Sequence, residues 1–240
     1  MPKACLIRQP AGLGDIILCH KIANVFVSKG YDVYWPVIDD YLMVANKYFN
    51  TTAINYCSVN GDYPLKNWFN SGRKIPAILG NGDVYLPLQY ADLQYPGQSV
   101  LESKFKILGT THSNWQQDFS FNRDQQKEDK LFYDVLGLKD EDNYLFCNMW
   151  YGSPPNQVLK DEINIDRGDV INMSFVDGYT IFDWCKVIEN AKEIHCVDTG
   201  LFYIIEYLDL KCSKLEAYSK FDPPDYRHIE NIFQKSWSYN

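Results

Sequence analysis

The chain has 240 residues, a formal net charge of −8 and a hydrophobic share of 46%. This length suits one large domain or two domains of about 120 residues each. The negative charge is spread without a run of like charges, which disfavours nucleic acid as a partner. No apolar run approaches the ~18 residues of a membrane-spanning helix, so none is expected.

Cysteine usage and the N-terminus indicate the compartment. The seven cysteines form no C-x-x-C pair, and several lie in apolar runs such as YLFCNMW and IHCVD, so buried, reduced thiols are expected. The N-terminus lacks the uninterrupted apolar stretch of a signal peptide, and a cytoplasmic location follows. The histidines show no metal-ligand spacing, so neither a metal nor a cofactor is expected.

The first third of the chain alternates between strand and helix periodicity. The sequence predicts, in order, a strand at 4–9, a helix at 15–29 closed by Gly30, a strand at 32–38, a helix at 39–49, and strands at 52–59 and 83–91. Such alternation is typical of a parallel sheet covered by helices on both faces, an α/β fold.

The same alternation restarts late in the chain, which predicts a second sheet. Strands are expected at 143–150, 193–198 and 213–219, with helices at 180–191 and 199–208. Two helical segments, 99–109 and 123–138, lie in between, and a linker is expected near 122–142. The domains predicted are 1–122, 140–225 and a terminal helix at 226–240 whose apolar face would cross back to the first domain.

The stretch GLGDIIL is nearly a dinucleotide-binding loop, but Ile17 stands where G-x-G-x-x-G has its third glycine. Asp15 follows Gly12 and Gly14 at the start of the helix, where a phosphate would otherwise bind. This carboxylate either caps the helix or lies in the crevice at the carboxyl end of the first strand, where it could act as a general base.

A second turn, HCVDTGLFYIIEYL, has the complementary composition. A buried strand ends at Asp198, and Thr199 and Gly200 begin a helix, so a hydroxyl and free backbone N–H groups could meet an anion. Gly200 would let a ligand approach the backbone closely. A plain turn with an Asp cap is the alternative.

The two turns together resemble the heptosyltransferase-type glycosyltransferases of family 9, which have G-D-[IV]-[IL] after the first strand and D-[TS]-G-x-x-H after a late strand. The resemblance implies a GT-B fold, in which two Rossmann-like domains face each other across a cleft. The N-terminal domain would bind a glycan or glycolipid acceptor and the C-terminal domain a nucleotide-diphosphate sugar. It implies an inverting, metal-independent transfer with Asp15 as general base.

Under this resemblance the donor would meet Asp198, Thr199 and Gly200. The family histidine falls on Tyr203, which can still donate a hydrogen bond, and the family lysine has only Lys160 as a counterpart. Further candidates, each with an ordinary structural role as its alternative, are Asn148 and Tyr151 for the base or phosphates, Asp177 for the ribose, and Arg8 with Gly12 and Gly14 as an acceptor or phosphate loop.

Two other functions remain open. An NAD-dependent reductase would use the first turn, with Asp39 or Asp40 on the ribose. A non-catalytic nucleotide-sugar binding module would fit the short chain and the missing histidine.

Overall fold

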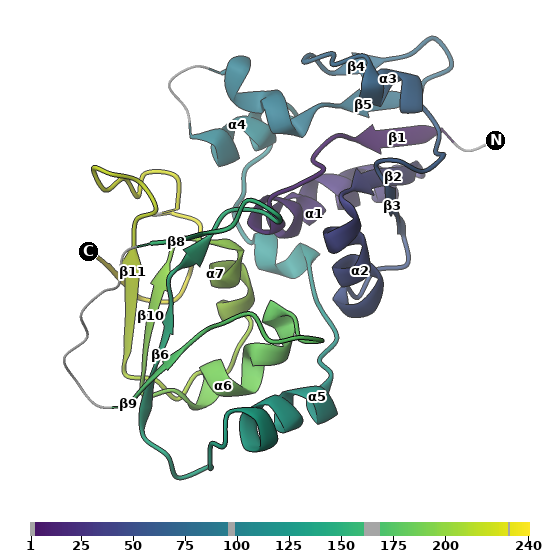
Figure 1. Cartoon of the computed structure of the whole chain (residues 1–240). Helices are drawn as coiled ribbons and strands as arrows, with labels where there is room; N and C mark the ends of the chain where they lie inside the picture. Colours follow the sequence, from purple (N-terminus) through teal and green to yellow (C-terminus); the bar gives the residue numbers. More distant parts are fainter. Residues whose placement is uncertain (1–2, 96–98, 161–168, 230) are drawn as a thin grey trace. The chain divides into compact units, whose positions relative to one another are not determined.

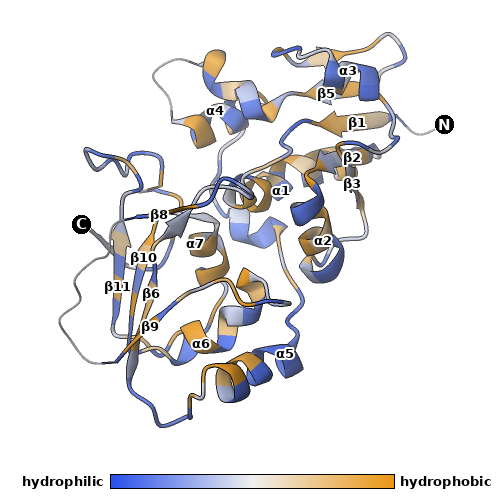
Figure 2. Ribbon diagram, viewed as in Figure 1, coloured by the Kyte–Doolittle hydropathy of each residue, from blue (hydrophilic) through white to orange (hydrophobic). Residues whose placement is uncertain are grey.

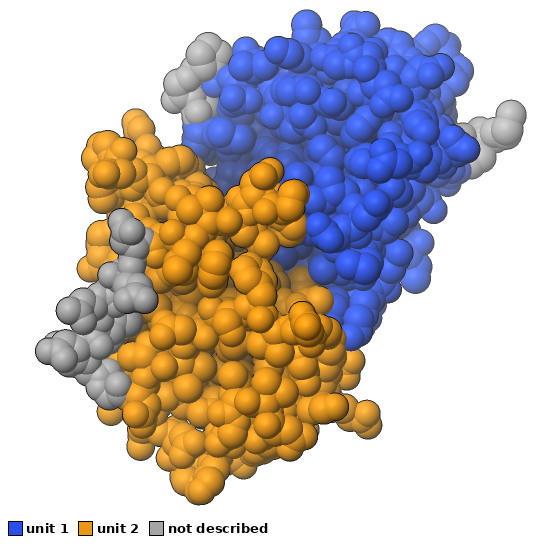
Figure 3. Space-filling view, in the orientation of Figure 1, with its two compact units in different colours: residues 1–122 blue, residues 123–240 orange. Residues whose placement is uncertain are grey.

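The computed structural model describes residues 3–95, 99–160, 169–229 and 231–240. The chain divides into two compact units, Met1–Asn122 and Arg123–Asn240 (Figure 3). Each unit contains a five-stranded sheet, and a two-stranded sheet completes unit 2. Residues 123–142, expected as a linker, belong to unit 2.

The elements of unit 1 are, in chain order, β1 (Ala4–Ile7), α1 (Leu13–Ser28), β2 (Asp32–Val37), α2 (Asp39–Tyr48), β3 (Ile54–Ser58), α3 (Lys66–Asn70), β4 (Ala77–Ile78), β5 (Val84–Leu86), the 3-10 helix η1 (Leu88–Leu93), α4 (Val100–Lys106) and the 3-10 helix η2 (Trp115–Asp118) (Figure 1).

The sheet of unit 1 has the order β3-β2-β1-β5-β4, with β4 antiparallel and the rest parallel. From β1 the chain builds outward through β2 and β3 and then returns to the other side of β1 with β5. The strand order therefore reverses between β1 and β5. In open α/β sheets this switch point, at the carboxyl ends of the strands, is where ligands bind.

Helix α1 is buried more completely than an amphipathic stripe would require, because it packs against β2 and also against α4 and η2. Its buried set includes Ile16, Ile17, Cys19 and Ala23. His20 is also buried, with Nε2 at 2.8 Å from the Tyr56 hydroxyl. Burial lowers the pKa of His20 to about 4.

The elements of unit 2 are α5 (Gln125–Asp129), the π-helical turn η3 (Lys130–Val135), β6 (Tyr144–Asn148), β7 (Trp150–Tyr151), β8 (Val158–Leu159), β9 (Asp169–Asn172), the 3-10 helix η4 (Ile181–Trp184), α6 (Cys185–Asn190), β10 (Glu193–Val197), α7 (Gly200–Ile205), β11 (Lys214–Tyr218) and β12 (Trp237–Tyr239).

The second large sheet is parallel throughout, in the order β12-β11-β10-β6-β9. Its inner strand β6 is mainly hydrophobic and buried along its whole length, as expected inside a parallel sheet (Figure 2). The order reverses between β6 and β10, so this sheet also has a switch point. The prediction of two parallel sheets is confirmed.

A buried ion-pair network holds α5 against α6. The Glu128 side chain is fully buried and accepts a hydrogen bond from Arg123 Nε at 2.8 Å. The same guanidinium donates from Nη1 to Glu189 Oε1 at 2.7 Å. Because Glu189 lies on α6, its contact with Arg123 ties the start of the expected linker to unit 2.

The prediction of a terminal helix at 226–240 is wrong. The described residues of this segment form turns and then β12, which pairs in parallel with β11. Of the apolar residues that suggested a helical face, Ile229, Ile232 and Trp237 are nevertheless buried. The Trp237 ring stacks on that of Phe202 with centroids 4.0 Å apart, and Phe233 packs against the same ring. The segment therefore extends the sheet of its own unit.

Within residues 3–95, 99–160, 169–229 and 231–240, no helix has the length and apolar character needed to cross a membrane.

Candidate functional site

The loop after β1 presents Asp15 in the first turn of α1. Gly12 precedes the helix with φ of 84°, a conformation that favours glycine. A Cβ at Gly12 would lie 2.5 Å from Asp15 Oδ2, so the carboxylate folds back over this glycine. Gly14 is buried inside the first turn. The N-cap of α1 is Gly12, which has no side chain, and Asp15 is the acid of the first turn.

The partner of Asp15 is a buried lysine from α4. Lys104 Nζ lies 2.6 Å from Asp15 Oδ1 and donates to Gln9 Oε1, also at 2.6 Å. The Lys104 side chain is 1% exposed, whereas that of Asp15 is 29% exposed. The carboxylate is therefore fixed from the protein side and still accessible to solvent.

Gln9 connects this ion pair to the sheet. Its side-chain nitrogen, Nε2, donates to the Ala11 backbone carbonyl at 2.6 Å, and its backbone carbonyl accepts from Trp35 Nε1 at 3.0 Å. Gln9 and Trp35 are both buried. The position of Asp15 thus depends on a chain of hydrogen bonds that reaches the core of unit 1.

Arg8 lies at the switch point between β1 and β5. Its backbone N–H donates to the Leu86 carbonyl at 2.8 Å, and its carbonyl accepts from the Gln89 N–H at 3.1 Å. The guanidinium lies between two aromatic rings, with Cζ at 4.8 Å from the ring centroids of both Phe69 and Tyr90.

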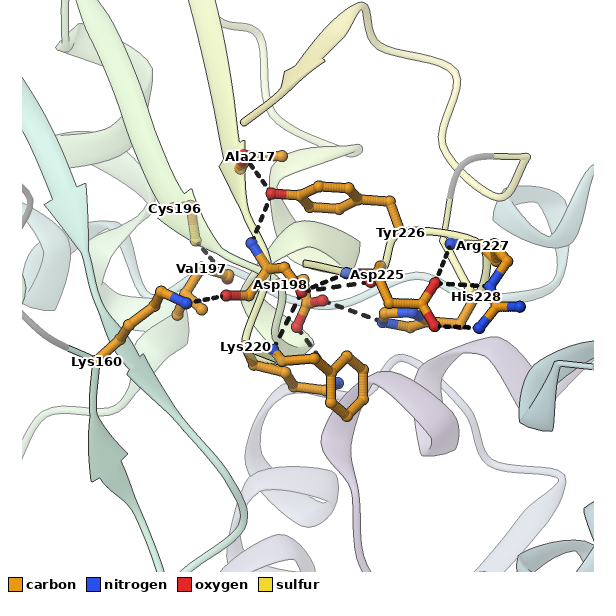
Figure 4. Close-up of polar contacts among 12 residues, drawn as sticks. Lys160, Cys196, Val197, Asp198, Ala217, Lys220, Asp225, Tyr226, Arg227 and His228 are labelled. Carbon is orange, nitrogen blue, oxygen red and sulfur yellow. Dashed lines mark hydrogen bonds and ion pairs between the residues drawn. The ribbon is translucent and has the colours of Figure 1, made fainter. Parts of the chain in front are cut away.

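The second predicted turn lies at the carboxyl end of β10. Asp198 follows the strand directly, and its side chain is 1% exposed. Its carboxylate pairs with two bases: Oδ1 lies 3.3 Å from Lys220 Nζ, and Oδ2 lies 3.1 Å from His228 Nε2 (Figure 4). Asp198 therefore anchors the segment that follows β11.

Thr199, not Asp198, is the N-cap of α7. Its hydroxyl oxygen accepts a hydrogen bond from the Leu201 N–H at 3.2 Å. The helix that begins at Gly200 has only 6 residues, much shorter than the helix expected at 199–208. A short helix has a weak dipole, so backbone amides alone provide little attraction for an anion here.

The segment after β11 brings basic groups to the edge where β10 ends. Lys160 donates to the carbonyl of Ser219, and Lys220 follows directly in the chain (Figure 4). The Ser219 hydroxyl oxygen accepts from the Phe221 and Asp225 N–H groups at 3.1 and 3.0 Å, which fixes the turn. Hydrogen bonds from Arg227 lower the pKa of Asp225 to about 2.

Three other donor candidates have ordinary structural surroundings. Asn148 is buried at the end of β6, where its Oδ1 accepts from the Trp150 N–H at 3.2 Å and its Nδ2 lies 3.5 Å from Cys196 Sγ. Tyr203 is 5% exposed and packs edge-to-face on Phe233, with the ring centroids 5.0 Å apart. Tyr151 packs against a buried cluster formed by Cys147, Met149 and Val197. A donor contact of Asn148, Tyr151 or Tyr203 stays a prediction.

Asp177 lies exposed in a turn between β9 and η4. The structure gives it no role at the end of β10, and the ribose contact remains only a prediction.

Sequence reasoning missed Lys104, Lys220 and His228. Each is a single basic residue without a local motif, and Lys104 lies in a helical segment where a lysine would be expected to face solvent. A weak signal existed for α4, because S-x-x-E at Ser99–Glu102 is a capping box, and the structure contains it. Nothing local predicts that this helix would pair a lysine with Asp15.

Comparisons with known proteins give a likeness in fold. No family model matches the chain, and no curated protein is similar to it in sequence. Among solved structures, the chain is similar to a glycosyl transferase of family 9 from Veillonella parvula, with a TM-score of 0.51 and 10% identity. The likeness covers 99% of this chain and 86% of the other. The chain therefore has a Rossmann-like α/β fold with parallel sheets, of the kind found in a family 9 glycosyltransferase.

Proposed function

We propose that the protein is a glycosyltransferase that moves a sugar from a nucleotide-diphosphate sugar to an acceptor hydroxyl with inversion. Unit 1 would bind the acceptor and unit 2 the donor, facing each other across a cleft as in a GT-B enzyme. The observation that carries the proposal is that both motif turns lie at the switch points of parallel sheets, and each holds a carboxylate paired with a basic side chain. The likeness to a family 9 structure supports the same assignment.

On the donor side, charge would come from side chains more than from the backbone. Lys160, Lys220 and His228 gather beside Asp198 and Thr199 at the end of β10 (Figure 4). Lys220 keeps about a third of its side chain exposed, so its ammonium can contact a phosphate while Asp198 holds it in place. Lysine ammonium groups at this place would stabilise the negative charge that develops on a leaving diphosphate.

On the acceptor side, Asp15 would accept the proton of the attacking hydroxyl. The acceptor oxygen forms a bond to the anomeric carbon as the bond from that carbon to the diphosphate oxygen breaks. Attack from the face opposite the leaving group inverts the anomeric centre. Lys104 holds Oδ1 of this carboxylate, and Oδ2 would accept the proton.

The first experiment is a thermal-shift screen of nucleoside diphosphates and their sugars, followed by measurement of donor hydrolysis and transfer with each compound that binds. Stabilisation by a nucleotide sugar together with turnover supports the proposal. Binding without any turnover would instead support the nucleotide-sugar binding module, and stabilisation by NAD(H) alone would support the reductase.

The second experiment tests the base. Asp15→Asn keeps an oxygen that can accept from Lys104 but removes the proton acceptor, so turnover should fall by about 10²–10⁴-fold with donor binding unchanged. Asp40→Asn, an exposed acid in the first turn of α2, is the matched control and should behave as wild type. Full turnover in Asp15→Asn would overturn the role of this residue.

A further inference from the structure

His228 is a second base at a carboxylate that one base already neutralises. Its Nε2 atom lies 3.1 Å from Asp198 Oδ2, and Lys220 Nζ lies 3.3 Å from the other oxygen, Oδ1 (Figure 4). A lysine ammonium is charged throughout the neutral pH range, so Lys220 alone balances the single charge of Asp198. The imidazole of His228 is therefore not needed as a counterion.

Both bases are held by the protein and still reach solvent. The Asp198 side chain is 1% exposed, whereas the side chains of Lys220 and His228 are 33% and 18% exposed. The partly exposed Phe221 ring packs edge-to-face on His228 with centroids 5.4 Å apart, and Lys220 Nζ lies 5.2 Å from the centroid of the same ring. An ammonium and an imidazole thus lie beside one exposed ring, at the carboxyl end of β10.

The charged groups around His228 come from three places and cancel in pairs. Asp198 ends β10, and Lys220, its partner, follows β11 directly. On the segment of His228 itself, Arg227 donates from Nε and Nη2 to the two carboxylate oxygens of Asp225, at 2.9 and 2.6 Å. These four charges sum to zero, so a ligand that brings negative charge would determine whether the ring binds a proton.

The contact between His228 and Asp198 depends on charge. It is close, yet within the described part of the chain Nε2 makes no aligned hydrogen bond. A histidine can bind a proton near neutral pH, and negative charge beside the ring favours the protonated form. An anion that contacts Lys220 would therefore favour protonation of His228, and the charged ring would attract both this anion and Asp198.

We propose that His228 takes up a proton from water when an anion binds at Lys220, so that the donor diphosphate binds more tightly as pH falls from about 8 to about 6. The identity of the anion as a donor diphosphate rests on the proposed function, but the proton-linked anion site does not require transfer. Lys220 provides a permanent positive charge and His228 a conditional one, while the buried carboxylate of Asp198 positions both.

The test uses sulfate as the probe, because this dianion keeps both charges across the neutral range and cannot itself supply or take up the proton. Proton NMR of the full chain follows the ring signals of its four histidines against pH, in sodium sulfate and in sodium chloride of equal ionic strength. His228→Gln identifies the signal of His228.

In sulfate the titration midpoint of His228 should move to higher pH by about half a unit to one unit. The midpoint of His112, a half-buried histidine of unit 1, should not move. An unmoved midpoint of His228, or an equal movement of His112, would overturn the inference on the wild-type chain alone.

Two lysine variants localise the anion. Lys220→Met should weaken sulfate binding about fivefold or more, because it removes the permanent charge. Lys214→Met is the matched control: Lys214 also pairs with a buried acid, Glu216, but at the start of β11, and this variant should bind sulfate as wild type does. Equal affinities of the two lysine variants would contradict the assignment.

The histidine variant tests the proton. Wild-type affinity for sulfate should rise about fivefold from pH 8 to pH 6, as linkage requires for a midpoint that moves by about one unit. His228→Gln keeps a polar side chain that cannot be charged, so its affinity should be the same at both pH values. A wild-type affinity that does not change with pH would reject the proposal, as would the same rise in a folded His228→Gln protein.

The failure of this inference and that of the proposed function give different results. Turnover of a nucleotide sugar without a sulfate-linked movement at His228 would reject only the proton-linked site. A sulfate site that depends on His228, without turnover of any nucleotide sugar, would reject only the transfer.

Discussion

The ion pair between Asp15 and Lys104 should determine how unit 1 tolerates changes at its proposed catalytic residue. Asp15→Ala would leave the Lys104 ammonium, on a side chain that is 1% exposed, with its hydrogen bond to Gln9 but without the carboxylate. Leaving a buried charge uncompensated costs about 3–5 kcal/mol. Because Asp15 itself is 29% exposed and partly screened by water, we expect the lower end of this range, about 3 kcal/mol.

The reverse substitution should cost less. Lys104→Met removes the buried charge, fills most of the same volume and leaves a carboxylate that water can reach. The loss is then the hydrogen bond to the Gln9 amide oxygen, about 1–2 kcal/mol. Once Lys104 is gone, Asp15→Ala should add little, so the double variant should resemble Lys104→Met. The expected coupling energy is about 2–3 kcal/mol.

Urea unfolding followed by tryptophan fluorescence measures the four proteins of this double-mutant cycle. Hydrogen exchange of α1 and α4 amides then assigns the change to unit 1, since two units can unfold separately. Additive costs, or an Asp15→Ala protein as stable as wild type, would refute the argument. The same reasoning makes Asp15→Asn, and not Asp15→Ala, the appropriate variant for testing catalysis.

Three further outcomes are expected. Burial holds the pKa of His20 in the folded protein near 4, below its unfolded value of about 6.5. The free energy of unfolding should therefore fall by about 3 kcal/mol as pH drops from about 6.5 to about 4, and His20 should cause no further change at lower pH. A His20→Gln protein that showed the same loss would contradict this. Arg123→Met should cost about 3–5 kcal/mol, because it leaves the fully buried Glu128 carboxylate without its ion-pair partner. Arg227→Met should cost clearly less, because the Arg227 side chain is 86% exposed and water screens its pair with Asp225; equal urea midpoints of the two variants would show that burial does not set the difference. Gly12→Ala should destabilise the protein more than Gly30→Ala, measured by thermal unfolding. Both glycines have positive φ, but only a Cβ at position 12 would clash with another group, the Asp15 carboxylate. Gly30→Ala alone should cost about 1–2 kcal/mol.

The two motif turns could be located from the sequence because their signals are local. GLGD comes between a strand and a helical period, and CVDTG does the same, so both had to lie at strand ends. The structure confirms the strands and helices on either side. The chemical roles of Asp15, Thr199 and Gly200 were inferred from resemblance and stay proposals.

The errors arose where tertiary contacts override a local period. Residues 226–240 space their apolar side chains as a helix would, yet Trp237 and Phe233 pack on Phe202 through turns and a strand. Pairing with β11 satisfies the backbone of Trp237–Tyr239, and packing on Phe202 of α7 buries the Trp237 ring, which favours a strand at this end of the segment. The donor contact of Tyr203, inferred from its place in a motif, stays a proposal, and in the structure this ring packs on Phe233.

The sequence by itself determined the alternation of strand and helix, the parallel sheets and the positions of the acids at two strand ends, since periodicity and turn chemistry act over a few residues. Only the tertiary structure decided the partners of those acids. Lys104 reaches Asp15 from α4, and His228 reaches Asp198 from beyond β11, both far away in the chain. A charge attracts whichever opposite charge the topology brings near it, and that distance is set by the packing of whole elements, which no short stretch of sequence contains.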